Sequence, residues 1–227
     1  DALKNSNAVI TLSLRDALMI ERLYGIEADF GGLGWEVTDY GSAGLEVLKK
    51  AKLANGEGYY VFVSSATKFA LESLKDMVQI FSTLPTTKLV VSRQISKYVK
   101  SKKNVVALNF LRPEELHQLY IHSHGVLAPL WKGSGIPIKM VEGLAYGKPV
   151  IVSKWVAETL PGLKHLENIY TVNSRGELKK ALGVLEADEG LREHLSNGAR
   201  SYYNNNLKWD HVVQRMKKVF ERVLLKE

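Results

Sequence analysis

The stretch from Gly125 to Ser153, GVLAPLWKGSGIPIKMVEGLAYGKPVIVS, constrains the fold more than any other part of the chain. In order, it reads as an apolar strand over 125–128, a glycine loop over 131–135, a helix over 137–146 and a strand over 149–152. Short apolar runs of this kind are typical of strands buried in a parallel sheet. Pro137 suits a first helical turn, and Gly147 suits the left-handed position that ends a helix. The stretch therefore predicts a strand–helix–strand unit.

The predicted helix has an apolar face and a face that carries charge. Helical spacing directs an apolar set toward the sheet, namely Ile138, Val141, Leu144 and Ala145. Lys139 and Glu142 lie three residues apart and share the other face. Gly133 and Gly135 would let an anion approach the free N–H groups and positive dipole at the helix start, and Lys139 adds a charge. Glu142 would repel a phosphate but suits the two hydroxyls of a ribose, so the pattern favours a nucleotide diphosphate.

A plainer interpretation of the same residues stays open on spacing alone. Many α/β proteins contain a strand, a glycine loop and a helix without binding a ligand there, and a short glycine loop is a weak motif. Lys139 and Glu142 would then be an ordinary solvated pair on a helix surface, contributing a few tenths of a kcal/mol.

The same stretch resembles the donor-binding signature of GT-B glycosyltransferases, in particular the family 4-like group. The family pattern is G-x-G…K-x-x-E-x-x-A-x-G-x-P-V-I. Its matches here are Gly133, Gly135, Lys139, Glu142, Ala145, Gly147, Pro149, Val150 and Ile151. Weaker similarities run along most of the chain. The resemblance implies an α/β fold, with a Rossmann-like parallel sheet covered by helices on both faces, as in the C-terminal half of a GT-B fold.

The resemblance also implies what the site residues do. Glu142 would hold the ribose hydroxyls, and the backbone of 133–135 would face the diphosphate or the sugar of a UDP- or GDP-sugar. Many family members carry a second glutamate eight positions before this one, where the chain has Ser134, which leaves the contact to the donor sugar unassigned. The expected reaction is sugar transfer to the hydroxyl of a carbohydrate or lipid-linked acceptor, with no cofactor required. A catalytic base is expected in another domain, so none is named.

The segments before this stretch alternate strands and helices, which predicts a parallel α/β sheet. Strands are predicted over 59–63, 88–92 and 104–108, with helices over 69–84 and 111–123. In the family a basic pair near Lys68 grips the diphosphate, but only the lysine has a match here, and a surface role is the alternative. Arg93 follows a strand at the end where ligands gather in such sheets, so it could reach a phosphate. The resemblance places the nucleotide base against the backbone of Asn109 to Leu111.

The first 33 residues have two interpretations. A strand over 8–12, a cap at Ser13, a helix over 14–24 with an apolar side that includes Leu18 and Leu23, and Gly25 together form a βα unit. In family 4-like enzymes a similar stretch closes the N-terminal, acceptor-binding domain. Residues 1–33 are therefore a remnant of such a missing domain or the first βα unit plus a linker, and 34–227 form the nucleotide-sugar-binding domain. The first residue, Asp1, also suggests a fragment.

The remaining elements carry less information about function. A helix is predicted from Ser42 to about Ala54, and another from 189 to Tyr203 that the run Asn204–Asn206 should break. A last amphipathic helix over 208–225 is interpreted as core packing. His117, His122 and His124 lie near one another, but the last two lack a third convergent ligand, so no metal site is predicted.

Composition bounds the alternatives. The 227 residues include 31 Lys plus Arg against 24 Asp plus Glu, a net charge of +7, and no cysteine, which excludes disulfides and fits a cytoplasmic protein. The densest basic cluster is Lys97, Lys100, Lys102 and Lys103. A solvated face is the default for it, with peripheral contact to the inner face of the membrane as the alternative. No nucleic-acid motif is present, and nucleic acid is not an expected partner.

Three other functions compete with sugar transfer. Ser134 and the incomplete loop at Lys68 suit a non-catalytic GT-B-like binding subunit. The same fold could serve a sugar-nucleotide epimerase. The net charge alone would suit a module that binds anions or nucleic acid.

Overall fold

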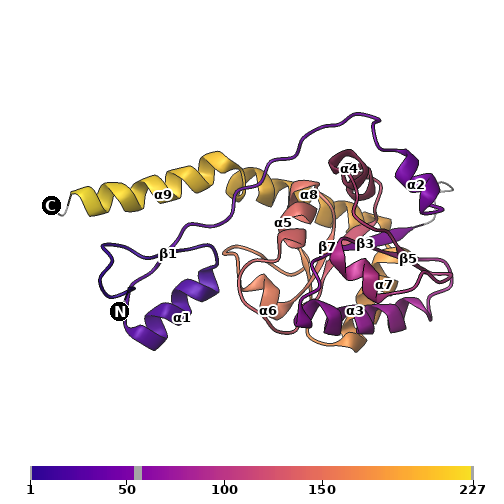
Figure 1. Ribbon diagram of the computed structural model, residues 1–227, viewed down its shortest axis with the longest axis horizontal. Helices are drawn as coiled ribbons and strands as arrows, with labels where there is room; N and C mark the ends of the chain where they lie inside the picture. Colours follow the sequence, from indigo (N-terminus) through magenta and orange to yellow (C-terminus); the bar gives the residue numbers. More distant parts are fainter. Residues whose placement is uncertain (1, 54–57, 226–227) are drawn as a thin grey trace.

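The computed structural model describes residues 2–53 and 58–225 and contains a parallel sheet in the order β5-β4-β3-β6-β7-β8 (Figure 1). Its strands are β3 (Tyr59–Val63), β4 (Lys88–Ser92), β5 (Val105–Ala107), β6 (Gly125–Ala128), β7 (Val150–Ser153) and β8 (Tyr170–Val172). Each pair of neighbours is parallel. The chain order changes direction between β3 and β6, and ligands bind at such a switch point in doubly wound sheets.

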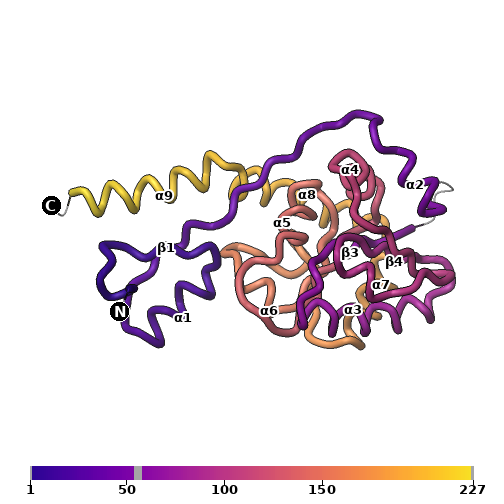
Figure 2. Tube along the Cα trace, viewed as in Figure 1, coloured from indigo at the N-terminus to yellow at the C-terminus, as the bar shows by residue number. Residues whose placement is uncertain are grey.

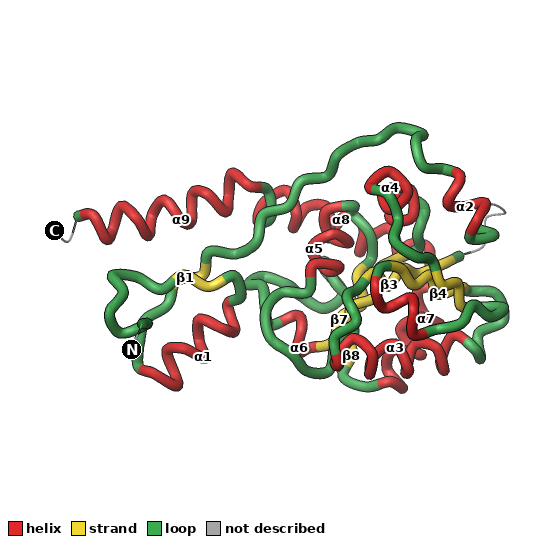
Figure 3. The backbone as a smooth tube through the Cα atoms, in the orientation of Figure 1, coloured by secondary structure: helices red, strands yellow, loops and turns green. Residues whose placement is uncertain are grey.

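The sheet is buried on both faces because its strands are apolar throughout. All five residues of β3 are buried, and successive side chains point into the two hydrophobic cores on opposite faces of the sheet. The first core contains Tyr59, Val61 and Val63, and the second contains Tyr60 and Phe62. Helices α4 (Pro113–Ile121) and α5 (Ile138–Ala145) contribute to the first core, and α3 (Lys68–Phe81) and α7 (Arg175–Ala187) to the second. Figure 3 shows the strands between these helices. The predicted α/β class, with helices on both faces, is confirmed.

A small N-terminal unit lies apart from this sheet. It comprises β1 (Ile10–Thr11), α1 (Leu14–Tyr24) and β2 (Asp29–Phe30), and β1 and β2 pair in parallel with each other only. Ser13 caps α1 as predicted, accepting from the Asp16 N–H. Contrary to the sequence expectation, Leu18 and Leu23 are 56% and 64% exposed.

The C-terminal helices α8 (Glu189–Asn206) and α9 (Trp209–Leu224) connect the two regions. The Arg215 guanidinium donates to the Gly31 carbonyl at 2.9 Å, and Arg222 pairs with Asp29, so α9 lies along the N-terminal unit (Figure 1). After β2 the chain crosses the molecule to α2 (Glu46–Lys50) at its far side (Figure 2). No helix among the residues described combines the length and apolar character that crossing a bilayer requires.

Two predicted element boundaries are wrong. The helix expected from residue 42 is the single turn and a half of α2, preceded by turns, and Ala54 lies outside the described residues. Helix α8 continues through the three asparagines, where Asn206 donates to the Tyr202 carbonyl. Tyr202 is buried in the first core, and such packing outweighs the weak helix propensity of asparagine.

The central unit β6–α5–β7 forms as predicted but is more deeply buried. Gly147 adopts the left-handed conformation (φ +59°) directly after the helix. Six consecutive residues of α5, from Lys139 to Leu144, are buried, whereas Ile138, expected against the sheet, is 45% exposed. Helix α5 can pack closely against β6 and β7 because Gly143 has no side chain. A Cβ at this position would lie 2.9 Å from Val126 Cβ and from Val150 Cγ2.

Gly143→Ala should lower the free energy of unfolding by about 1–3 kcal/mol, because overpacking forces α5 away from β6 and β7. Gly183→Ala on α7 is the matched control. Apart from the neighbouring backbone of its own helix, no heavy atom of the described residues would lie within 4 Å of its added Cβ, and the change should raise the free energy of unfolding by about 0.5–1 kcal/mol. Chemical denaturation of both variants checks the pair, and equal effects would contradict this account of the packing.

Candidate functional site

Two adjacent cavities lie at the carboxyl ends of the central strands. The first, of about 570 Å³, lies between the start of α3, the loop after β6 and the start of α5, and its polar lining includes Lys68, Arg93, Gly133, Ser134 and Lys139. Thr67 caps α3 by accepting from the Ala70 N–H at 3.3 Å. The amino-terminal ends of two helices thus face this cavity, and their dipoles and the cationic side chains of its lining, which also include Lys132, favour an anion.

The second cavity, of about 270 Å³, lies between the chain segment 35–40, the end of β4 and helices α4 and α5. Its lining is more aromatic and contains one buried carboxylate. The principal residues are Trp35, Tyr40, Phe110, Leu111, Tyr120, Glu142 and Tyr146. Arg93 lines both cavities, so they meet at its side chain.

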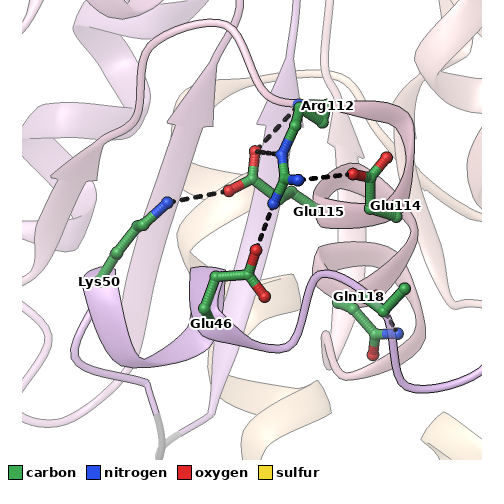
Figure 4. Close-up of polar contacts among 7 residues, drawn as sticks. Glu46, Lys50, Arg112, Glu114, Glu115 and Gln118 are labelled. Carbon is green, nitrogen blue, oxygen red and sulfur yellow. Dashed lines mark hydrogen bonds and ion pairs between the residues drawn. The ribbon is translucent and has the colours of Figure 1, made fainter.

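Polar contacts join α2 to the start of α4 (Figure 4). Helix α4 in turn lines the second cavity with Pro113, Leu116 and Tyr120. Glu115 accepts from the Arg112 N–H and from Lys50, both at 3.0 Å, and the N–H bond lowers the pKa of its carboxyl group. Arg112 also pairs with Glu46 and Glu114. Gln118 donates to the carbonyl groups of residues 41 and 43, which fastens the preceding segment to α4.

Lys139 is a buried cation at the edge of the first cavity. It is 6% exposed, and its Nζ lies 5.1 Å from the centroid of the Phe62 ring. Burial lowers the pKa of its ammonium group to about 8; the Glu142 carboxylate opposes this shift, and the Arg93 charge adds to it. An anion in the cavity would stabilise the charged form.

Glu142 is 2% exposed, and each of its carboxylate oxygens has a partner. The Tyr120 hydroxyl donates to Oε2 at 2.5 Å, and Arg93 donates to Oε1 at 3.2 Å. Tyr120 is fully buried and stacks on Tyr146, with ring centroids 4.8 Å apart. Burial raises the pKa of Tyr120, so its hydroxyl remains a donor. Glu142 is therefore not half of a solvated pair with Lys139.

Arg93 has a backbone conformation that is unusual for its residue type. Its φ of +69° and ψ of −158° lie in a region that glycine occupies almost alone. Its side chain is 33% exposed, so it is the accessible member of the cluster with Tyr120 and Glu142.

The glycine loop has contacts to two other elements. The Gly133 carbonyl accepts from Trp155 Nε1 at 3.1 Å and from Arg15 at 3.4 Å. Trp155 belongs to α6 (Lys154–Ala157), and the Arg15 guanidinium of α1 lies 3.9 Å from the centroid of its ring. Gly133 and Gly135 both have positive φ, so their left-handed backbone suits glycine.

The structure divides the sequence-predicted residues between the cavities. Lys68, Gly133, Ser134 and Lys139 line the first, Leu111 and Glu142 line the second, Arg93 lines both, and Gly135 lines neither of them. Sequence reasoning missed the contribution of the segment 35–40 and of the two stacked tyrosines to the second cavity. Tyr120 lies in α4 and Tyr146 directly follows α5, where core packing is the usual role of a tyrosine, and the segment 35–40 carries no periodic signal.

The described part of the chain contains no group of three or more His, Asp or Glu side chains that could hold a metal ion. His117 is buried beside Tyr40 and Tyr146, and His124 pairs with Glu186. A cation-lined cavity next to an aromatic cavity with one buried carboxylate suits a ligand that joins an anionic group to a diol and a flat ring.

Comparisons with solved structures agree with this fold. The structure matches sucrose-phosphate synthase from Thermosynechococcus elongatus with a TM-score of 0.78 and 16% identity, over 99% of this chain and 60% of that one. It matches a glycosyltransferase from Rickettsia africae with a TM-score of 0.81 and 14% identity, over 98% and 64%. It matches Anabaena HepE in complex with UDP-glucose with a TM-score of 0.77 and 15% identity, over 98% and 65%.

Sequence comparisons give the family. An uncharacterized glycosyltransferase from Methanocaldococcus jannaschii is 25% identical over 107 residues, which span 47% of this chain and 26% of that protein. The chain thus covers about a quarter of this relative and under two thirds of the solved structures above. The family model described as glycosyl transferases group 1 matches residues 59–188, from β3 to the end of α7. The chain belongs to the group 1 glycosyl transferases.

Proposed function

We propose that this chain binds a nucleotide diphosphate sugar and supplies the donor-binding part of a glycosyltransferase that transfers the sugar to an acceptor hydroxyl. The observation that carries the proposal is the buried Glu142 carboxylate, held beside a cavity whose charged lining is cationic. Family membership supports the reaction class. The UDP-glucose bound to HepE, which shares this fold, supports a UDP-sugar, with a GDP-sugar as the alternative.

In this proposal the donor spans both cavities. The diphosphate lies in the first, between the starts of α3 and α5, near Lys68, Lys139 and the backbone of 133–135. The ribose hydroxyls donate to Glu142, and the base lies in the second cavity near Leu111. Stabilising charge on the departing diphosphate then accelerates transfer, and cations and N–H groups supply that stabilisation. No catalytic cofactor or metal is part of the proposal.

We further propose that residues 1–33 belong with an acceptor-binding domain and that 34–227 form the donor-binding domain. The apolar side chains that α1 and α9 expose support this, including Leu18, Leu23, Phe220 and Leu224. Exposed apolar surface of this extent suits contact with another domain. The catalytic base and the site for a carbohydrate or lipid-linked acceptor would then lie outside the donor-binding domain.

The relatives reported above support sugar transfer over the competing functions. The relatives from Methanocaldococcus jannaschii and Rickettsia africae are named glycosyltransferases and that from Thermosynechococcus elongatus a sucrose-phosphate synthase, so neither a binding subunit nor an epimerase is favoured. Only the net charge suggested a module that binds nucleic acid. The cations at the site line a cavity beside a carboxylate, and this arrangement does not favour that function.

We also propose that the protein is cytoplasmic and contacts the inner face of the membrane. The lysine cluster identified in the sequence is exposed on and after the 3₁₀ helix η1 (Gln94–Tyr98). Tyr98 in its midst is 64% exposed and borders an apolar groove of about 450 Å³ with Leu74, Val78 and Val99. Lysines around an amphipathic aromatic residue complement anionic lipids, each contributing about 1 kcal/mol.

Glu142→Ala should lower the affinity for UDP or GDP at least about tenfold, because the ribose loses a charged acceptor. Isothermal titration calorimetry measures the loss, and circular dichroism checks the fold. Glu186→Ala is the control, because that glutamate pairs with His124 away from both cavities and should leave the affinity unchanged. Unchanged affinity in Glu142→Ala would refute the proposed site.

Affinity for UDP should fall as the pH rises through about 8, because the Lys139 ammonium group, whose pKa burial lowers to about 8, loses its proton in that range. A bound diphosphate raises that pKa, so binding is strongest below it and weakens by at most about tenfold per pH unit above it. Calorimetry from about pH 7 to 9.5 tests this. Lys139→Arg, which stays charged, should flatten the profile. A flat profile in the unmodified protein would contradict this role.

Reversing two lysines of the cluster, Lys102→Glu with Lys103→Glu, should reduce binding to vesicles of phosphatidylglycerol at least about tenfold, since each lysine contributes about 1 kcal/mol. The control reverses Lys179 and Lys180, which are exposed on α7. Vesicle co-sedimentation gives the readout, with neutral phosphatidylcholine vesicles for comparison. Equal losses in both double variants would mean that net charge alone drives binding.

A further inference from the structure

Arg93 covers the carboxylate to which the proposed function assigns the ribose. Its guanidinium donates to Glu142 Oε1 at 3.2 Å, while Tyr120 holds Oε2 from the interior. Tyr120 is fully buried under the Tyr146 ring, whereas the Arg93 side chain is 33% exposed. Of these two partners, only Arg93 can leave without opening the core.

The place that Arg93 would move to is the neighbouring cavity. Arg93 lines the cavity that Lys139, Lys68 and the glycine loop also line, and its charge contributes to the electrostatics at Lys139. An anion in that cavity would attract the guanidinium. The structure shows the ion pair with Glu142, and an anion in the first cavity would favour a second arrangement in which the guanidinium turns toward it.

The backbone of Arg93 indicates that its side chain has a specific role. A non-glycine residue at φ +69° and ψ −158° carries backbone strain, which persists only where the surrounding structure enforces it and is common at ligand-binding sites. Glycine would adopt this conformation without strain. The backbone contacts of Arg93 do not need the side chain: its carbonyl accepts from the N–H and hydroxyl of Ser96.

We propose that Arg93 is a specificity-determining residue that lets the site distinguish nucleoside diphosphates from nucleosides. The inference rests on the proposed function. A nucleoside must displace Arg93 from Glu142 and offers the guanidinium no new anion. A nucleoside diphosphate displaces it too, but its phosphates replace the lost carboxylate with a charge-assisted pair. Arg93 thus opposes binding of the ribose alone and favours binding of the ribose with its diphosphate.

Arg93→Gly tests this without straining the fold. The variant should bind uridine at least about threefold more tightly, because Glu142 is uncovered, and UDP about tenfold more weakly, because a phosphate partner is lost. The ratio of the two affinities should therefore shrink by about thirtyfold. The same measurements with guanosine and GDP cover the other candidate base. Lys97→Ala removes an equal charge outside both cavities and should leave the ratio unchanged.

The outcomes separate this inference from the proposed function. If the unmodified protein binds UDP or GDP and Arg93→Gly changes nucleoside and diphosphate affinity by the same factor, or changes neither, Arg93 does not discriminate and only this inference fails. If the unmodified protein binds neither nucleoside nor diphosphate, the proposed function fails with it. Opposite changes in the two affinities support the inference, because a purely structural ion pair would not produce them.

Discussion

Burying the carboxylate of Glu142 is the constraint on which the site depends. A charged group that is 2% exposed needs partners for its oxygens, since an unpaired buried charge is very costly. Tyr120 comes from α4 and Arg93 from the end of β4, so three elements meet at one side chain. Helix α5 can bring the carboxylate this deep because Gly143 lets it lie close to β6 and β7. Packing and electrostatics thus determine one another here.

The sequence predicted the central unit well because several local signals agree there. Apolar runs mark β6 and β7, Gly147 ends α5, and Ser13 caps α1 in the distant N-terminal unit. The predicted site residues, apart from Gly135, each line at least one of the two adjoining cavities, and Arg93 lines both. Local signals of this kind are carried by one or two residues each, so they survive without knowledge of tertiary contacts.

The features that sequence reasoning missed depend on long-range contacts. No local sequence signal indicates that Trp35 and Tyr40 line a cavity together with residues from α4 and α5, far along the chain. Nor does any indicate that Gln118 of α4 hydrogen-bonds to the end of their segment. Nor does composition reveal that Arg93 takes a glycine-type conformation, because only the surrounding structure determines it. Leu18 and Leu23, expected on the apolar side of α1, are exposed, whereas Ala17 on the same helix is buried. The sequence pattern predicts that α1 forms, but the contacts of α1 with the rest of the structure determine which of its faces is buried.

The contacts of Arg15 have a mechanical consequence. Its guanidinium sits against the Trp155 ring and donates to the carbonyl groups of Trp155 and Gly133, and the Leu14 N–H donates to the Thr159 carbonyl. These contacts fasten the start of α1 to α6 and to the glycine loop. Because of these contacts, a rotation of the N-terminal unit relative to the sheet would displace the glycine loop at the mouth of the first cavity.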